Sequence, residues 1–445
     1  MTAYDLIIRG ATLVNHDGIG PGDVAVKDGR TAAIGDLGQA EGAQVIDADG
    51  LHLLPGVIDT QVHFREPGAE HKEDLEFGSR AAVLGGVTAV FEMPNTRPNT
   101  STPEAIADKL RRAEGRMWCD HAFYVGATAE NADQLGELER LPGTAGVKIF
   151  MGASTGDLLV ADDENLARVL RSIRRRCAVH AEDEFRMQER HHIAEAAGRP
   201  HAHPDWRDAQ SALLATQRLI GLAREIGRRV HVLHITTAAE IEFLGRHRDI
   251  ATVEVTPQHL TLTAPDCYDR LGTLAQMNPP IRDAAEQAGL WLGVAQGIVD
   301  VVGSDHAPHG REEKAAIYPA SPSGMPGVQT LLPILLDHAA HGRLTLSRLV
   351  DLTSAGAARI FGIAAKGRLG VGYDADYTLV DLAAERTIED DWIASKCGWT
   401  PFSGQRVRGW PKLTVIRGRV VMAEDELVGK ADGRPLRFWE TIDAA

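Results

Sequence analysis

The pattern of apolar and polar positions divides the chain into three stretches. The first fifty residues carry short alternating segments broken by Gly and Asp, as is typical of antiparallel β-hairpins. The same pattern returns near the end, in GRLGVGYDADYTLVDL and KLTVIRGRVVM. Two β-rich ends around one long middle indicate that the ends pair into a single small β-sandwich domain.

The middle of the chain alternates between apolar strands and amphipathic helices. Its helical stretches, such as TPEAIADKLRRAEG and DENLARVLRSIRRR, repeat apolar residues every three or four positions. The predicted strands are Val57–His63, Thr88–Met93, His121–Val125, Gly146–Phe150, Ala178–His180, Val230–His234, Thr252–Val255 and Val299–Ser304. Eight such units in a row predict an α/β fold, a (β/α)8 barrel of the TIM type. The predicted domains are therefore residues 1–53 and 367–445 for the β-sandwich and 54–366 for the barrel.

The composition of the chain argues against some classes of binding partner. The chain has 445 residues, an ordinary apolar fraction of 44% and a formal net charge of −15. This acidic balance argues against a nucleic acid or an anionic membrane as partner, since both require a basic face. The N-terminus has no basic leader followed by an apolar core, and the four cysteines are scattered without CxxC spacing. We expect a cytoplasmic protein with reduced thiols and a small-molecule substrate.

Polar residues gather where the predicted strands end. In such a barrel the residues at the carboxyl ends of the strands converge on one face, where active sites lie. A single histidine at a strand end is more often a hydrogen-bonded structural residue than a metal ligand, but five residues of this kind on five strands favour a common site. They are His63, Lys148, His180, His234 and Asp305.

The chemistry that fits this set is hydrolysis at a metal centre. Neutral imidazoles suit zinc and similar divalent ions. Lys148 stands where a bridging carboxylate is needed, and a free ammonium is a poor neighbour for a cation. A lysine carbamylated by CO2 would instead be an anionic bridge between two metals.

The motifs together resemble a known family. VHFREPG, GGVTAVFEMPNT, GVKIFMG, VHAED, LHITT, NPPIRD, VGSDHAPH and TPFSG look like the dihydroorotases of the amidohydrolase superfamily, the type related to the multifunctional pyrimidine-pathway enzymes. The resemblance runs from about residue 4 to about residue 437. It implies zinc, one or two ions per chain, N6-carboxylated Lys148, and His180 with His234 at the more buried metal. It also implies His63 and Asp305 at the other metal, Asp305 as general acid and base, and a homodimer.

Gln61 departs from the family pattern, which has histidine there. An amide oxygen is a weaker ligand for zinc than an imidazole nitrogen, so this metal position would be weakened or reorganised. Two interpretations stay open. Either the enzyme works with one tight and one loosely held metal, or the chain is a structural relative that has lost catalysis.

The resemblance also assigns the substrate contacts. Arg65, Asn95 and His309 would bind a carboxylate, and Arg65 can do so with paired charge-assisted hydrogen bonds. The alternative for Arg65 is a surface ion pair with Glu66 or Glu70. Asn278, with the backbone near Ser323 and Gly324, would meet the amide edge of a pyrimidine ring.

These contacts favour dihydroorotate, the substrate that carries a carboxylate. The implied reaction is the reversible cyclisation of N-carbamoyl-L-aspartate to L-dihydroorotate in pyrimidine synthesis, by a metal-activated hydroxide with Asp305 moving the proton. Two rival functions remain. One is another cyclic amidohydrolase of the allantoinase or hydantoinase kind; the other is a non-catalytic subunit associated with aspartate transcarbamoylase.

Structural predictions can also be made for three further segments. The loop of residues 309–327, rich in Gly, Pro and Ser, is expected to be a lid over the site or a long connection. The histidine-rich segment 191–206 is expected to be a solvent-exposed connection rather than a second metal site. Residues 174–176, three arginines, are interpreted as the solvated end of a helix.

Overall fold

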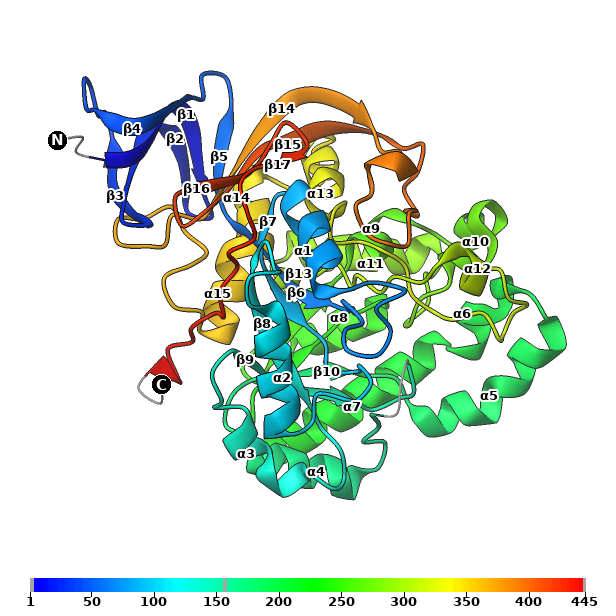
Figure 1. Cartoon of the computed structure of the whole chain (residues 1–445). Helices are drawn as coiled ribbons and strands as arrows, with labels where there is room; N and C mark the ends of the chain where they lie inside the picture. Colours follow the sequence, from blue (N-terminus) through cyan, green and yellow to red (C-terminus); the bar gives the residue numbers. More distant parts are fainter. Residues whose placement is uncertain (1–3, 155–157, 443–445) are drawn as a thin grey trace.

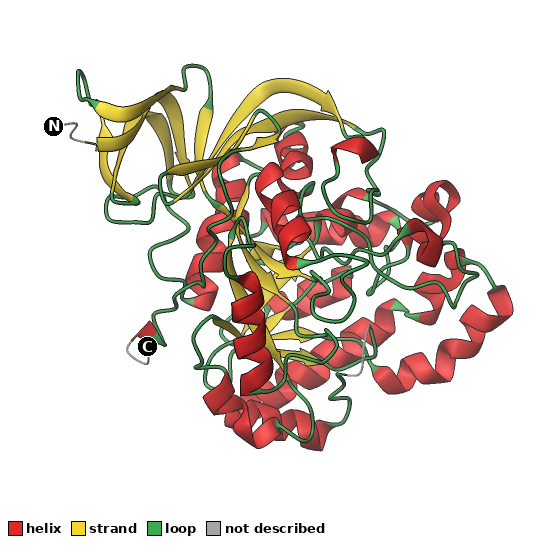
Figure 2. Ribbon diagram, in the orientation of Figure 1, coloured by secondary structure: helices red, strands yellow, loops and turns green. Residues whose placement is uncertain are grey.

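Two sheets organise the computed structural model, which describes residues 4–154 and 158–442. One is an eight-stranded parallel sheet wrapped into a barrel and surrounded by helices; the other is a nine-stranded sheet built from both ends of the chain. Figures 1 and 2 show the second sheet lying to one side of the barrel.

The barrel strands follow one another in sequence order, each paired in parallel with the next. A parallel bridge between Val62 and His306 joins the first strand to the segment that follows the last, so the barrel is nearly closed. The predicted barrel is confirmed. Its strands are β6 (Val57–Val62), β7 (Val87–Glu92), β8 (Asp120–Gly126), β9 (Thr144–Phe150), β10 (Cys177–His180), β11 (Val230–Val232), β12 (Ala251–Val255) and β13 (Val301–Val302).

Amphipathic helices cover the barrel. In α4 the apolar residues Leu166, Val169 and Leu170 are buried while the charged ones face outward, and Asp162 caps the first turn through a bond from Asn165 N. Among the described residues no helix is both long and apolar enough to cross a membrane. The helices are α1 (Leu75–Leu84), α2 (Pro103–Ala113), α3 (Leu135–Leu138), α4 (Asp163–Ser172), α5 (Glu184–Ala197), α6 (His203–Trp206), α7 (Ala209–Ile226), α8 (Ala238–Gly245), α9 (Pro257–Thr261), α10 (Asp266–Leu271), α11 (Ala284–Ala295), α12 (Arg311–Lys314), α13 (Leu331–Ala340), α14 (Leu346–Val350) and α15 (Gly356–Phe361).

The nine-stranded sheet joins the two ends of the chain. Its central contact is antiparallel, with Tyr377 of β14 opposite Pro55 of β5. The predicted pairing of the two β-rich ends is thus confirmed. Because β5 leads into β6 after a single residue, no linker separates the sheet from the barrel. The strands are β1 (Tyr4–Asn15), β2 (Gly18–Lys27), β3 (Arg30–Gly35), β4 (Gly42–Asp47), β5 (His52–Pro55), β14 (Tyr377–Thr387), β15 (Arg406–Ile416), β16 (Arg419–Ala423) and β17 (Glu426–Leu427).

The interpretation of residues 174–176 as the solvated end of a helix holds for Arg174, which is exposed, but is wrong for Arg175. The helix α4 ends at Ser172, and Arg175 is only 5% exposed. Its Nη1 donates to the backbone oxygens of Glu139 and Thr144, each at 2.8 Å. A run of like charges is usually solvated, but buried carbonyls can use a guanidinium as a donor, and the sequence does not show where those carbonyls lie.

Three aromatic rings, Phe91, Phe361 and Phe438, pack in the barrel interior, and we call them the floor cluster. Phe91 meets the other two edge-to-face, with centroid distances of 5.0 and 5.9 Å. Phe438 comes from the C-terminal segment, which runs past α15 (Figure 1) and bridges His121 near the start of β8 through Pro435. The end of the chain therefore closes the barrel at the amino ends of its strands.

Candidate active site

The predicted site residues come together around the carboxyl ends of the barrel strands. His180 ends β10, His63 directly follows β6, and Lys148 lies within β9. His234 and Asp305 lie just beyond β11 and β13, which are both shorter than predicted. The charge of Lys148 acts on all four of the other residues and contributes to their pKa values, as expected for one cluster.

His180 and His234 form the inner pair. Nδ1 of His180 lies 3.0 Å from Nε2 of His234, and both rings are buried. Burial lowers the pKa of both, so both are neutral at pH 7. Nε2 of His180 bonds to Glu182 at 2.9 Å and carries the proton, which leaves the Nδ1 lone pair turned toward His234. Two imidazole nitrogens thus converge on one point.

Glu182 and Arg207 are functional residues that the sequence reasoning missed. Glu182 is fully buried, and Nε of Arg207 donates to both of its carboxylate oxygens at 3.1 Å. Burial alone would raise the pKa of Glu182, but Arg207 and His180 hold it well below its ordinary value. The carboxylate is therefore an anion that fixes the tautomer of His180. The motif VHAED contained Glu182, but nothing local pointed to its arginine.

His63 and Asp305 form the outer pair. Nε2 of His63 lies 3.2 Å from Oδ1 of Asp305, and its Nδ1 lies 2.8 Å from Oδ1 of Asn95. Gln61 donates to the same Asp305 oxygen from Nε2 at 2.9 Å. Burial alone would raise the pKa of Asp305, but the hydrogen bond and charge of His63 hold it below its ordinary value. Asp305 is thus ionised and able to accept a proton.

Lys148 is buried without an anionic partner. No carboxylate in residues 4–154 and 158–442 forms an ion pair with it, and its Nζ lies 4.4 Å from the ring centroid of Phe150. Burial lowers the pKa of Lys148 to about 7. A large fraction of neutral amine is therefore present at neutral pH, and the neutral amine is the form that reacts with CO2.

The donor set fits a divalent metal, subject to that modification. As the side chains stand, no group of three or more His, Cys, Asp or Glu in the described ranges could hold a metal ion. The four ligand residues form two pairs, and the charge of Lys148 acts on both, so a carboxylated Lys148 would supply the carboxylate that the set lacks. Two buried atoms of the site, Gln61 Oε1 and His234 Nδ1, have no hydrogen-bond partner among the described residues. Buried polar atoms usually have one, so these two could accept a further ligand.

Three site residues adopt a left-handed backbone conformation. Arg65, His234 and Asp305 have φ values of 62°, 37° and 45°. Such conformations cost roughly 1–3 kcal/mol for residues with a Cβ and persist where the surroundings enforce them. The turns that end these strands are therefore held by the fold in an unfavourable conformation, which aims the side chains into the barrel mouth.

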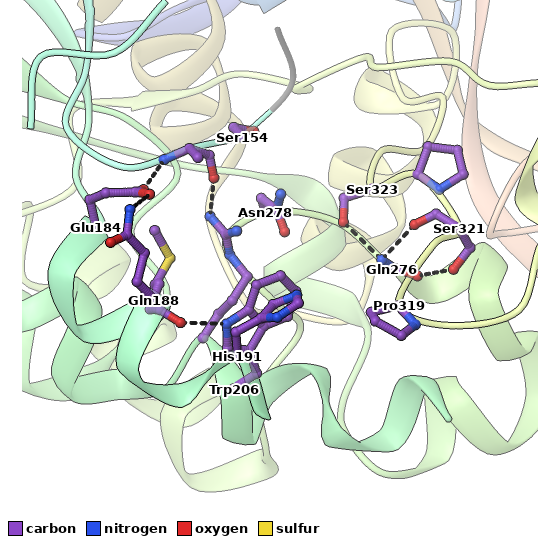
Figure 3. Close-up of a pocket in the computed structure, with 14 residues that line it drawn as sticks. Ser154, Glu184, Gln188, His191, Trp206, Gln276, Asn278, Pro319, Ser321 and Ser323 are labelled. Carbon is purple, nitrogen blue, oxygen red and sulfur yellow. Dashed lines mark hydrogen bonds between the residues drawn. The ribbon is translucent and has the colours of Figure 1, made fainter. Parts of the chain in front are cut away.

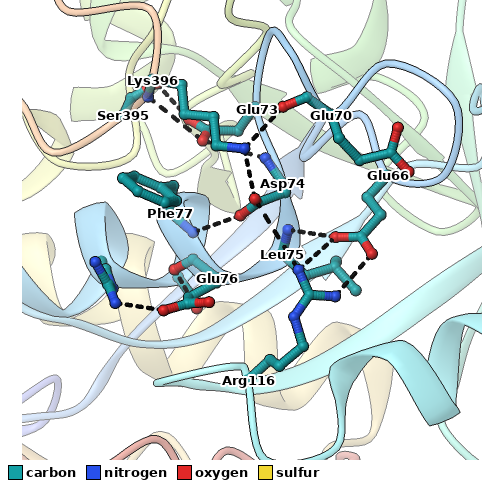
Figure 4. Close-up of polar contacts among 12 residues, drawn as sticks. Glu66, Glu70, Glu73, Asp74, Leu75, Glu76, Phe77, Arg116, Ser395 and Lys396 are labelled. Atoms are coloured by element: carbon teal, nitrogen blue, oxygen red, sulfur yellow. Dashed lines mark hydrogen bonds and ion pairs between the residues drawn. The ribbon is translucent and has the colours of Figure 1, made fainter.

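Arg65 is buried at the mouth and is not part of a surface ion pair. Its side chain donates to the backbone oxygen of Pro308 at 3.3 Å and to Nε2 of His309 at 3.2 Å. Glu66 instead pairs with Arg116, which follows α2, at 2.7 Å, as Figure 4 shows. Within the described chain no carboxylate lies in ion-pair range of Arg65, which is 5% exposed. A buried guanidinium of this kind is ready to receive an anion.

The loop that carries His63 and Arg65 is anchored from the C-terminal region. Asp74 caps α1 by accepting from Phe77 N at 2.8 Å, and Lys396 pairs with Asp74 while donating to Glu70 O at 2.8 Å (Figure 4). Segments more than three hundred residues apart in sequence thus fix this loop.

A cavity of about 490 Å³ is lined by residues that include Asn278, Gln276 and Ser323 (Figure 3). Arg207 also lines it and connects it to the inner pair, because Arg207 binds Glu182, the partner of His180. Asn278 accepts at Oδ1 from Nε2 of His203 at 2.9 Å. The prediction that segment 191–206 is a solvent-exposed connection is therefore wrong at two points. The segment begins within α5, and His203 is fully buried, where its ring contacts Asn278 of the cavity wall.

The loop after β13 is anchored rather than loosely extended. It contains α12, and Tyr318 and Met325 are buried. Both backbone groups of Gly324 bond inside the protein, N–H to Gln276 O at 2.8 Å and C=O from Lys314 at 3.0 Å. Ser323, half-buried and part of the cavity lining, is the neighbour that faces open space.

Comparison with known proteins gives matches over nearly the whole chain. Residues 52–421 match the model described as Amidohydrolase family. A dihydroorotase of Halobacterium salinarum is 37% identical, over 93% of this chain and 96% of the relative. An allantoinase of Solibacter usitatus is also 37% identical, over 97% of both chains. The solved structure of an L-hydantoinase from Arthrobacter aurescens superimposes with a TM-score of 0.93 at 32% identity, covering 97% of this chain and 99% of that one.

Proposed function

Because the chain belongs to the amidohydrolase family and is a cyclic amidohydrolase, we propose that it is a dihydroorotase. It would interconvert N-carbamoyl-L-aspartate and L-dihydroorotate as a step of pyrimidine synthesis. Dihydroorotate combines a cyclic amide with a carboxylate, so the site must supply both a hydrolytic centre and an anion contact.

The observation that carries this proposal is the buried, unpaired guanidinium of Arg65. Burying a cation without an anion is costly, and a substrate carboxylate would remove that cost. His309 accepts from Arg65 and donates from Nδ1 to Glu313 at 3.0 Å, so its ring is fixed beside the guanidinium. Allantoin and hydantoin have no carboxylate and would leave Arg65 unpaired.

The residues of the site divide the chemistry between them. Arg65, His309 and Asn95 would hold the carboxylate. Asp305 would accept a proton from the attacking water and deliver it to the leaving ring nitrogen; its ionised state and its position between His63 and Gln61 support this role. Arg207 and Glu182 would hold His180 in one tautomer.

Zinc is the proposed metal, with Lys148 carboxylated. A bound metal would polarise the ring carbonyl and lower the pKa of water. His180 and His234 with modified Lys148 would hold the inner ion. His63 and Asp305 would hold an outer ion weakly, because Gln61 turns its amide nitrogen, not its oxygen, toward Asp305.

The test is a substrate panel with purified protein, zinc and bicarbonate. We expect ring opening of L-dihydroorotate and much slower opening of allantoin and dihydrouracil. In Arg65→Met the KM for dihydroorotate should rise by about 30-fold or more, since a lost charge-assisted pair costs roughly 2–5 kcal/mol. Arg80→Met, on the outer side of α1 and paired with Glu76, is the matched control and should behave as wild type.

Other results would reassign the function. Turnover of allantoin with an unchanged KM in Arg65→Met would indicate an allantoinase. No turnover in the wild type, restored by Gln61→His, would support the non-catalytic role, for which co-purification with aspartate transcarbamoylase is the check. The homodimer and the cytoplasmic location stay predictions.

A further inference from the structure

Four lysines of the described chain are buried, and two of them have carboxylate partners. Lys109 pairs with Glu92, and Lys366 pairs with Asp120. Lys148 and Lys314, by contrast, form no ion pair within the described ranges. Lys148 belongs to the metal site. Lys314 is fully buried in α12 and has no role in the chemistry described so far.

Lys314 is compensated by three backbone carbonyls. Its Nζ donates to Gln276 O at 2.9 Å, to Pro322 O at 2.8 Å and to Gly324 O at 3.0 Å. Burial lowers the pKa of Lys314 to about 7, and in its ammonium form the side chain has three N–H donors, all of which are used. One side chain therefore ties α12 to the segment after α10 and to the turn of residues 322–324.

Further bonds brace the same turn against Gln276. The side chain of Gln276 donates from Nε2 to Ser321 O at 2.9 Å and to Ser323 Oγ at 3.1 Å, as Figure 3 shows. Gly324 has φ of 136°, and a Cβ there would lie 2.5 Å from Ala307 O. A side chain at position 324 would therefore be strained, and Lys314 donates to two carbonyls of this turn.

The braced turn forms part of the cavity wall, which also includes Arg207, the partner of Glu182. Ser323 and Asn278 both line the cavity, and Asn278 is two residues beyond Gln276. Resting on the proposed function, we propose that Lys314 is a positioning residue that sets Ser323 relative to Asn278, so that together they bind the amide edge of the cyclic substrate. A residue needed only to fill this space would be apolar, because burying an ammonium costs free energy that methionine does not.

The test separates substrate capture from stability. Lys314→Met removes all three donors, and Lys314→Gln keeps an amide donor should the first variant fold poorly. Phe438→Leu, in the floor cluster, is the control that lowers stability away from the cavity. We would measure kcat and KM for L-dihydroorotate, zinc content, thermal stability, and the affinity for orotate, whose ring carries a similar amide edge and carboxylate.

The expected result is a rise in KM of about 10- to 100-fold in Lys314→Met, a smaller rise in Lys314→Gln, and kcat within about three-fold of wild type. Zinc content should be unchanged, and the affinity for orotate should fall in parallel with the rise in KM. Phe438→Leu should keep the wild-type KM. If Lys314→Met and Lys314→Gln lose stability like the control but keep the wild-type KM, the proposed role is wrong.

Failure of the proposed function would appear in the wild-type protein, in its choice of substrate and its binding of orotate. A wild-type protein that opens allantoin but not dihydroorotate refutes the dihydroorotase, while the effect of Lys314→Met on the KM for allantoin still tests the positioning role. A wild-type protein that neither opens a cyclic amide nor binds orotate refutes both.

Discussion

The two ends of the barrel differ in side-chain packing and in backbone conformation. At the floor, Phe91, Phe361 and Phe438 pack edge-to-face, and Arg175 lies over Phe438 at 4.4 Å. At the mouth, the backbone turns at Arg65, His234 and Asp305 are held in left-handed conformations. Buried atoms without a hydrogen-bond partner among the described residues occur at both ends, for example His234 Nδ1 at the mouth and Arg175 Nη2 at the floor. We infer from this difference that packing elsewhere in the fold offsets the unfavourable backbone conformations at the mouth, which hold the site residues in place.

The largest expected effect comes from a mouth residue. Asp305→Asn keeps the shape of the side chain but removes the proton acceptor, so kcat should fall by about 10³- to 10⁴-fold. The free energy of unfolding should fall as well, because a folded-state pKa below the ordinary value means that the ionised Asp305 contributes stability at pH 7. Steady-state kinetics and denaturant unfolding measure the two quantities. A variant that loses stability and keeps its activity would invert the comparison.

The next effect belongs to the floor. Phe438→Ala should lower the free energy of unfolding by roughly 3–5 kcal/mol, since a large ring is removed from a packed interior. The KM of the folded fraction should not change, because Phe438 packs against Phe91 and Arg175 at the end of the barrel opposite the site. Thermal unfolding and kinetics at low temperature are the measurements. A selective loss of substrate affinity would mean that the two ends are coupled.

The smallest effect is a pH dependence that compares one buried histidine from each end. Burial lowers the pKa of His203 at the mouth to about 3 and that of His121 at the floor to about 4. Below the ordinary value of 6.5 the unfolded chain takes up protons that the folded chain does not, so stability falls as the pH falls from 6.5 toward those values.

Replacing either histidine with asparagine should reduce that slope by up to about 1.4 kcal/mol per pH unit. Only His203→Asn should also raise the KM, because His203 holds Asn278. Unfolding curves at several pH values, with kinetics at pH 7.5, make the comparison. Equal KM values in the two variants would remove the role given to His203.

Much of this organisation could be predicted from the sequence, for local reasons. Apolar runs followed by His63, Lys148, His180 and His234 mark strand ends, and the topology of the barrel then brings them together. The errors have a common cause. Arg175 and His203 lie in segments whose local composition is that of exposed chain, and each is buried by carbonyls or an amide far away in sequence.

The partners Glu182–Arg207 and Lys314–Gln276 escaped prediction for the same reason. In each pair a charged side chain contacts a residue that is distant in sequence, and the course of the loops brings the two together. Hydrophobic periodicity identifies the strands and helices but contains no information about which loop covers which. Gln61 could be recognised as unusual, but its contact with Asp305 through the amide nitrogen required the structure.

The closing of the barrel by Phe438 also bears on how the protein is made. A ribosome releases the N-terminus first, so β1 to β5 and most of the barrel leave it while β14 and the floor-closing segment are still untranslated. The nascent chain then carries an open sheet edge and an unsealed apolar interior. Folding can therefore finish only after Pro435 and Phe438 have left the ribosome, and a chain truncated before Pro435 would keep the residues of the mouth on a barrel that stays open at the amino ends of its strands.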